Sequence, residues 1–248
     1  MEKLKNFRSK LKTKDQHTIG FWSQYFNYLS IKTICDLNYD WICLDMEHGI
    51  YDFKDISRLT DLIKFKKKIP FVRLSSSNTE NIQKALDAGC LGLILPMIEN
   101  PSHLDSLIKK TTYPPSGNRS VGYSNSNEFG KNLNSDLEKK FRPIVIIQIE
   151  SKLGVENIEE ITNQSGIDGI LIGPYDLSSS LGCPGDFSNK NYQDALDKIY
   201  KVLSKKNIAN GYHIVTPDPS ELLKRKEEGY NFIAYGTESS FMKSFFNI

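Results

Sequence analysis

The sequence of 248 residues has little cysteine and no long uninterrupted apolar run. Its four cysteines, Cys35, Cys43, Cys90 and Cys183, are scattered without CxxC spacing, which argues against a zinc site and against a disulfide framework. No apolar window approaches the roughly 18 residues that a membrane helix needs. The charged first residues contain no apolar core of a secretory signal. We therefore expect reduced thiols, no membrane partner and a cytoplasmic location.

An excess of charge of one sign is also missing, since 32 Lys and Arg face 30 Asp and Glu. No dense basic block alternates with aromatic residues, so a nucleic-acid partner is not expected. The run 64–68, "KFKKK", follows a helical pattern and is typical of a solvated helix end. The fold must therefore be predicted from the spacing of apolar residues along the chain.

That pattern contains eight strand-like runs, between most of which lie amphipathic segments of helical length. The strand-like runs are 17–22, 41–46, 71–74, 91–97, 144–150, 167–173, 209–214 and 232–236. This alternation predicts a (β/α)8 TIM barrel, an α/β fold that residues 1–248 would form as one domain. A doubly wound open sheet is the alternative, although no glycine-rich phosphate motif follows the first strand.

One long irregular segment interrupts the alternation at residues 111–136, which are rich in Pro, Gly, Ser and Asn. Loops of this length in a compact domain are usually functional or disordered. The segment falls between the fourth and fifth strands. We expect it to lie over the carboxyl ends of the strands as a lid.

Two acids, Glu150 and Asp176, follow the fifth and sixth strand-like runs, and groups at the carboxyl ends of barrel strands are typically catalytic. A carboxylate there is costly unless a cation meets it. The pair therefore predicts a site for a hard cation, because Mg²⁺ commonly takes one or two carboxylates plus water and substrate oxygens. Two ordinary helix N-cap acids are the open alternative.

Other polar residues end the first, second, third and fifth runs: Trp22, Asp45, Glu47, His48, Arg73 and Gln148. His48 is suited to be a general base, or it merely forms a hydrogen bond in a loop. Asp87, near the end of the helical pattern after the third strand, would orient His48 or is simply a helix-end residue. Arg73 would face an anion or a developing oxyanion, unless it forms a structural salt bridge with Asp45 or Glu47.

Five blocks of sequence resemble the class II metal-dependent pyruvate aldolases, of the 4-hydroxy-2-oxoheptanedioate and 2-dehydro-3-deoxyglucarate aldolase type. They read "YDWICLDMEHG", "PFVRLSSSNTENIQKALDAGCLGLILPM", "YPPSGNRSVG", "VIIQIES" and "GIDGILIGPYDLSSSLGCPGD". They occur in family order between about residues 20 and 236.

The resemblance implies a lyase that reversibly cleaves a 4-hydroxy-2-oxo acid to pyruvate and an aldehyde through a metal-stabilised enolate. Glu150 and Asp176 would hold the divalent metal, which would be Mg²⁺, Mn²⁺ or Co²⁺. His48 would be the base, Asp87 the acid beside it and Arg73 the enolate-binding arginine. The substrate contacts would fall to Gln148, Tyr175 and Asp176. No Schiff-base lysine is needed, and no lysine ends a strand-like run.

Three departures from the family pattern concern the aldehyde and the C-terminal region. Asn125 and Asn127 occupy the lid, where many relatives carry an arginine, so a cation for a carboxylate-bearing aldehyde is missing. Tyr175 replaces a small residue of some members, and Glu238 stands where aspartate is commoner. The resemblance also implies a homo-oligomer, often a hexamer, in which the apolar C-terminal segment docks on a neighbour. Packing of that segment on its own barrel is the alternative.

Two other functions remain as alternatives from this sequence. One is a citrate-lyase-like carbon–carbon lyase that acts on an acyl-CoA ester. The other is a non-catalytic barrel that binds a ligand. The combination of Glu150, Asp176, His48 and Arg73 favours the enzyme, since a binding protein has no evident physical need for all four.

Overall fold

Eight parallel strands close into a barrel in the computed structural model, which describes residues 2–25, 27–138 and 141–246. Each strand pairs with the next along the chain, and β8 pairs with β1. The strands are β1 (Thr18–Ser23), β2 (Trp41–Asp45), β3 (Ile69–Arg73), β4 (Gly92–Leu95), β5 (Ile144–Ile149), β6 (Gly169–Ile172), β7 (Ala209–Ile214) and β8 (Phe232–Thr237). The predicted TIM barrel is confirmed, and the open-sheet alternative is wrong.

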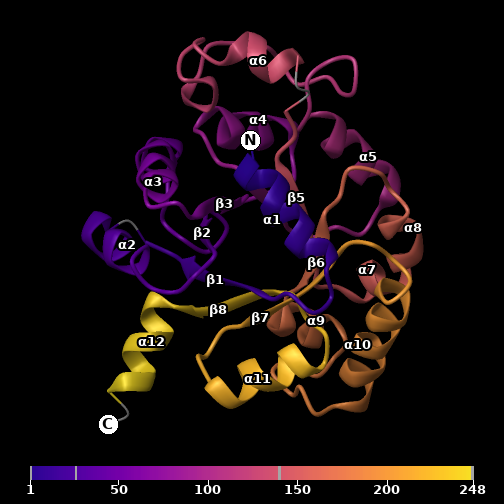
Figure 1. Ribbon diagram of the computed structural model, residues 1–248. Coiled ribbons are helices and arrows are strands. Elements are labelled where there is room, and N and C mark those ends of the chain that lie inside the picture. Colours follow the sequence, from indigo (N-terminus) through magenta and orange to yellow (C-terminus); the bar gives the residue numbers. More distant parts are fainter. Residues whose placement is uncertain (1, 26, 139–140, 247–248) are drawn as a thin grey trace.

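Helices surround the barrel and close its amino end (Figure 1). They are α1 (Glu2–Lys12), α2 (Tyr28–Ile34), α3 (Phe53–Phe65), α4 (Thr79–Asp87), α5 (Pro101–Lys109), η1 (Asn125–Asn127), α6 (Leu133–Glu138), α7 (Lys152–Glu156), α8 (Ile158–Thr162), α9 (Pro174–Ser180), α10 (Lys190–Leu203), α11 (Pro219–Glu227) and α12 (Glu238–Phe245). None of the helices in the described ranges is long and apolar enough to cross a membrane. All four cysteines are buried and unpaired, as expected.

The amino end of the barrel is filled by large aromatic side chains. The rings of Trp41 and Phe232 stack with centroids 4.1 Å apart, and Phe71 packs against both. Glycine at neighbouring strand positions makes room for them, because a Cβ on Gly20 would lie 2.1 Å from the Trp41 ring and one on Gly92 would lie 2.3 Å from Phe71. Such alternation of large and small residues fills a barrel. Leu4, Phe7 and Leu11 of α1 cover this layer, so the opposite, carboxyl end is left for a site.

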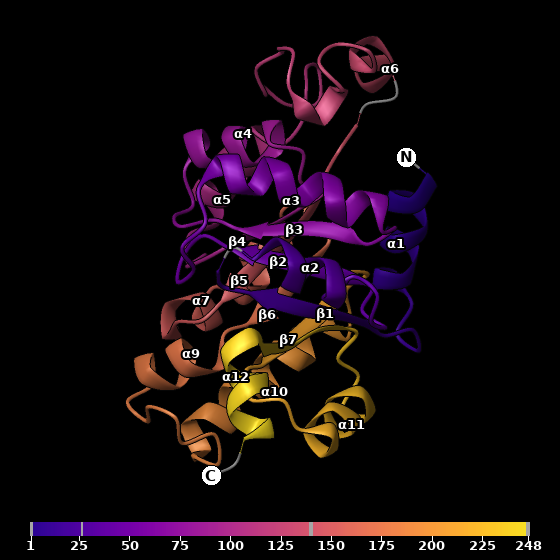
Figure 2. The ribbon, with the colours of Figure 1, turned by 90° about the vertical axis from the view of Figure 1, so that its left-hand side faces the viewer.

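The expectation that residues 111–136 cover the chain's own carboxyl face is wrong. The segment follows α5, which has already returned the chain to the amino side of the barrel, so its place between two strands did not determine its side. It packs on α3 and α4, where Arg119 Nη2 lies 2.7 Å from Asp87 Oδ1 and Asn125 Nδ2 lies 3.1 Å from Asp61 Oδ1. Figure 2 shows this region, with α6, projecting beyond α4 and away from the strands.

Candidate active site

The carboxyl ends of β2 and β3 bring Asp45 and Arg73 together, since the two residues are register partners in the barrel. Arg73 Nε and Nη2 donate to the two oxygens of Asp45 at 2.8 and 2.6 Å, and Nη1 lies 2.7 Å from Glu47 Oε2. Trp22 Nε1 also donates to Asp45 Oδ2, at 3.1 Å. Burial pushes the pKa of Asp45 upward, but Arg73 and Trp22 outweigh it and hold that pKa below its usual value. The salt-bridge alternative for Arg73 is therefore present, and the guanidinium still lines a cavity.

The end of β5 supplies a buried carboxylate, Glu150, and an amide, Gln148. Glu150 Oε1 accepts a 2.7 Å hydrogen bond from the backbone N–H of Met97, and Gln148 Nε2 donates to Glu150 Oε2. Burial raises the pKa of Glu150 to about 7; the Met97 N–H opposes this, and the charges of Glu47 and Asp176 add to it. Met97 has a left-handed backbone (φ 51°), which explains why β4 ends before it. The turn after β6 passes so close that a Cβ on Gly173 would lie 2.7 Å from Glu150 Oε2.

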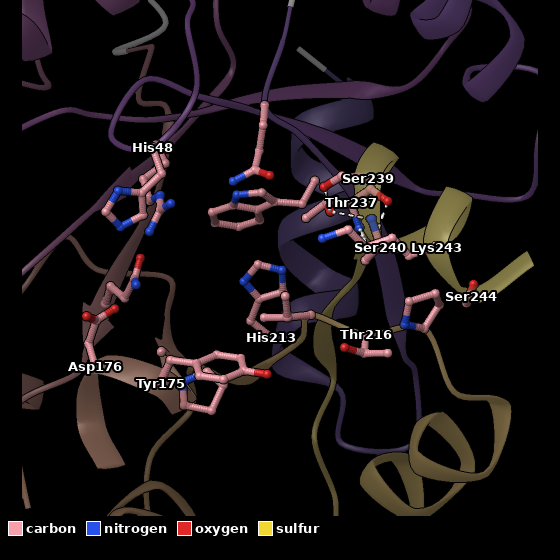
Figure 3. A pocket seen from close by; sticks show the side chains of 18 residues that line it. His48, Tyr175, Asp176, His213, Thr216, Thr237, Ser239, Ser240, Lys243 and Ser244 are labelled. Atoms are coloured by element: carbon pink, nitrogen blue, oxygen red, sulfur yellow. Dashed lines mark hydrogen bonds between the residues drawn. The ribbon is translucent and has the colours of Figure 1, made fainter. Parts of the chain in front are cut away.

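Asp176 and Tyr175 lie in the first turn of α9, directly after β6. Both are exposed and line the cavity. The Tyr175 ring packs edge-on against Phe187 with centroids 5.2 Å apart, so it forms part of the wall. Figure 3 shows Asp176 on the same side of the cavity as His48.

A divalent cation fits this side of the cavity. Burial and the charges of Glu47 and Asp176 raise the pKa of Glu150, and a cation bound beside this carboxylate would oppose that effect. Gln148 Oε1 is buried and accepts no hydrogen bond within the described ranges. No cluster of three or more His, Cys, Asp or Glu side chains suited to a metal occurs among the described residues. Glu150 and Asp176 would therefore be supplemented by water and substrate oxygens, as Mg²⁺ commonly is.

His48 follows β2 and lines the cavity half-buried. Its backbone N–H lies 3.4 Å from Asp45 Oδ1, and its imidazole has no hydrogen-bond partner in the part of the chain that the structure describes. The ring is therefore not committed to holding a loop. The structure does not bring Asp87 to His48 within one chain, because Asp87 ends α4 on the amino side of the barrel and pairs with Arg119.

Sequence reasoning missed His213, on β7. Its ring packs on Trp22 with centroids 4.4 Å apart, and the Arg73 guanidinium lies over the Trp22 ring, 5.0 Å from its centroid. Burial, reinforced by the charge of Arg73, lowers the pKa of His213 to about 3, so the ring is neutral. The available signal was a histidine inside a strand-like run, but that pattern alone does not say which face it occupies.

These residues surround one cavity of about 890 Å³ at the carboxyl end of the barrel (Figure 3). Side chains and loops from β1, β2, β3, β5, β6, β7, β8, α9 and α12 line it: Trp22, Gln24, His48, Arg73, Gln148, Gly173, Pro174, Tyr175, Asp176, His213, Val215, Thr216, Pro217, Thr237, Ser239, Ser240, Lys243 and Ser244. Predicted site residues His48, Arg73, Gln148, Tyr175 and Asp176 therefore meet here, with Glu150 directly behind Gln148.

Known proteins resemble this chain over almost its full length. The family model described as HpcH/HpaI aldolase/citrate lyase matches residues 18–244. A protein of Escherichia coli O6:H1 named 5-keto-4-deoxy-D-glucarate aldolase is 30% identical over 96% of this chain and 92% of its own length. The crystal structure of an HpcH/HpaI aldolase/citrate lyase family protein from Burkholderia cenocepacia superposes with a TM-score of 0.91, at 27% identity over 98% of this chain and 96% of that chain. An HpcH/HpaI aldolase from Desulfitobacterium hafniense shares the fold, with a TM-score of 0.83 at 22% identity over 93% and 90% of the two chains.

Proposed function

This chain belongs to the HpcH/HpaI aldolase/citrate lyase family, and we propose that it is a metal-dependent lyase that cleaves a 4-hydroxy-2-oxo acid to pyruvate and an aldehyde. Membership makes it an aldolase-type enzyme. The observation that carries the metal and pyruvate parts of the proposal is that Asp176 and Arg73 line one cavity, with Glu150 hydrogen-bonded to Gln148 in its wall. Two acids for a cation and one guanidinium for an oxyanion are what enolate chemistry requires.

Glu150 and Asp176 would hold the divalent ion, Mg²⁺ or else Mn²⁺ or Co²⁺. Such an ion supplies Lewis-acid polarisation of a carbonyl, worth several kcal/mol of charge stabilisation. Gln148 would bind a substrate oxygen through its amide nitrogen, which donates one N–H to Glu150 and has a second N–H to donate. Asp176 and the backbone at Tyr175 would complete the contacts to the pyruvate half of the substrate.

Cleavage begins when His48 takes the proton of the hydroxyl group on C4, directly or through a water. The C3–C4 electron pair then moves toward C2 as the aldehyde leaves, and negative charge develops on the C2 oxygen. Arg73 stabilises this enolate. Because Asp45 and Glu47 already hold the guanidinium in place, it needs little reorganisation during the reaction. A proton returned to C3 completes pyruvate. Asp87 stays a predicted partner of His48. It would orient this histidine only if assembly brought it to the His48 of a neighbouring copy.

The test is pyruvate release from a panel of 4-hydroxy-2-oxo acids with Mg²⁺, Mn²⁺ or Co²⁺, with and without chelator. Glu150→Ala should remove metal-dependent release, whereas Glu160→Ala, an exposed acid on α8 outside the cavity, should retain it. Release that ignores both chelator and Glu150→Ala would contradict the proposal. Turnover of an acyl-CoA ester in place of the oxo acids would move the assignment to the citrate-lyase-like branch.

We also propose a homo-oligomer, of which a hexamer is one form, and a cytoplasmic location. The support for assembly is the apolar surface around α12. Phe241 packs on Phe21 of its own barrel with ring centroids 6.0 Å apart, but Met242 and Phe245 are exposed. Phe241 therefore packs on its own barrel, and Met242 and Phe245 of the same helix are available for contact with a neighbouring copy.

A further inference from the structure

The cavity is larger than pyruvate requires, and its two sides differ in charge. Its volume of about 890 Å³ falls in the range of roughly 300–1,000 Å³ that accommodates drug-sized ligands. Figure 3 shows His48 and Asp176 on one side and Ser239, Ser240 and Lys243 on the other, with His213 between them in this view. The side with His48 holds the acid cluster. The far side therefore remains for the rest of a longer substrate.

Several polar groups on the far side are already used by the fold. Ser240 forms a capping box with Thr237 at the start of α12, and the Ser239 hydroxyl lies 3.2 Å from that of Thr237. The Ser244 hydroxyl donates to the carbonyl of Phe241. These side chains shape the wall and position α12, but their hydroxyl groups are engaged.

Three polar side chains of the cavity wall have no such partner. Gln24, Thr216 and Lys243 line the cavity, and neither an ion pair nor a side-chain hydrogen bond joins them to the rest of the described chain. They come from three different elements: the loop after β1, the loop after β7 and helix α12. Convergence of a cation, a hydroxyl and an amide from separate elements is the usual form of a specificity subsite.

We propose that this subsite binds an anionic group, a carboxylate or a phosphate ester, at the far end of the aldehyde half of the substrate, with Lys243 as its cation. The inference rests on the proposed function and supplies its substrate class. The Lys243 ammonium would meet the anion as a flexible point charge, and Gln24 and Thr216 would donate hydrogen bonds to it. Lys243 would supply this cation from the chain's own α12, whereas the segment with Asn125 and Asn127 packs on α3 and α4.

The negative charge on the His48 side of the cavity also favours a substrate orientation in which the anionic tail points toward Lys243. Asp176 lines the His48 side, and Asp45 and Glu47 adjoin Arg73 there, so this side carries more negative than positive charge. An anionic tail is repelled from that side unless the divalent ion binds it, and the pyruvate half occupies that ion. The tail therefore extends past His213 toward Lys243, which places the aldehyde carbon between the two ends.

The experiment measures aldol addition of pyruvate to matched aldehydes in the presence of Mg²⁺. Succinic semialdehyde and butanal differ in a terminal carboxylate, and glyceraldehyde 3-phosphate and glyceraldehyde differ in a phosphate. In the wild type, kcat/KM should be higher for the anionic member of at least one pair. The pair that shows this preference identifies the anion as a carboxylate or a phosphate. Lys243→Met should reduce that preference about tenfold through KM, and Lys243→Arg should restore most of it. Raising ionic strength should shrink the preference, because the ammonium group is exposed.

Lys201→Met, which removes an exposed lysine on α10 outside the cavity, is the matched control and should keep the wild-type preference. Exchange of the C3 hydrogens of pyruvate in deuterium oxide, which needs no aldehyde, reports the proposed function separately. Exchange with no anionic preference, or a preference that survives Lys243→Met, would overturn the subsite alone. No metal-dependent exchange in the wild type would overturn the proposed function on which it rests.

Discussion

At the scale of the residue, burial of Glu150 couples the chemistry of the site to the stability of the fold. The residue is 3% exposed and its carboxyl group is affected by the charges of Glu47 and Asp176, so ionisation is costly and the pKa rises to about 7. An unfolded chain has no such penalty and loses this proton near the ordinary value of 4.5. Between these two pH values the folded protein holds more protons than the unfolded one, so its stability falls as pH rises. A cation bound beside Glu150 would lower the cost of its ionisation.

Glu150→Gln should stabilise the metal-free protein at pH 8 and leave it nearly unchanged near pH 4.5. A shift from 4.5 to about 7 corresponds to ~3 kcal/mol at about 1.4 kcal/mol per pH unit. The amide can keep the Met97 hydrogen bond and, with Gln148 turned over, the second one. Urea unfolding across this pH range in chelator measures the effect.

Added Mg²⁺ should then raise the unfolding free energy of the wild type more than that of Glu150→Gln, since only the carboxylate gains a new partner. Equal pH slopes for the two proteins in chelator would show that Glu150 does not carry this ionisation cost. An equal response to Mg²⁺ would place the ion elsewhere. Either result would be obtained without any assay of catalysis.

At the scale of elements, an ion-pair cluster joins α1 to the amino ends of β5 and β6. Asp168 is 3% exposed and accepts hydrogen bonds from Arg8 Nε at 2.7 Å, Arg142 Nη2 at 2.6 Å and the backbone N–H of Val145 at 3.0 Å. Arg8 and Arg142 are partly exposed, so water can take over some of their bonds. The carboxylate has no such substitute.

Asp168→Asn should lower the unfolding free energy by about 2–3 kcal/mol, because a buried charged pair is broken from one side while part of each arginine stays solvated. Asp105→Asn is the control: its surface pair with Lys109 spans one helical turn and such pairs are worth about 0.3–0.5 kcal/mol. Denaturant unfolding compares the two. Equal losses of unfolding free energy in the two variants would contradict a stabilising role for the Asp168 cluster.

The strands and the polar residues that end them could be predicted from the sequence, because a strand such as Ile144–Ile149 is buried along its whole length. Its next residue, Glu150, then falls at the carboxyl end by geometry alone. The side taken by residues 111–136 could not be predicted from composition, since it depends on whether a helix precedes or follows the loop. His213 and Lys243 were equally hidden: one required the register of β7, and the other the direction in which α12 leaves the barrel.

At the scale of the whole molecule, the surface between α2 and α12 is apolar and suited to contact with another copy. A groove of about 520 Å³ there is lined by Phe21, Leu29, Ser30, Thr33, Ile34, Leu37, Tyr39, Glu238 and Phe241. The neighbouring side chains of Met242 and Phe245 are 58% and 85% exposed. Apolar patches of this kind commonly mark an interface. Figure 1 shows α12 projecting from the end of β8, away from the ring of strands.

The wild type should sediment as an oligomer, and the double substitution Met242→Ser with Phe245→Ser should shift it toward smaller species. Burying each of these side chains is worth roughly 1.5–3 kcal/mol, so losing two weakens association by at least a hundredfold if both lie in the interface. Phe65→Ser is the control, because Phe65 is 82% exposed on α3 outside the groove. Sedimentation velocity over a range of concentrations separates the outcomes: a monomeric wild type would contradict assembly, and an unchanged double variant would place the interface on another face of the barrel.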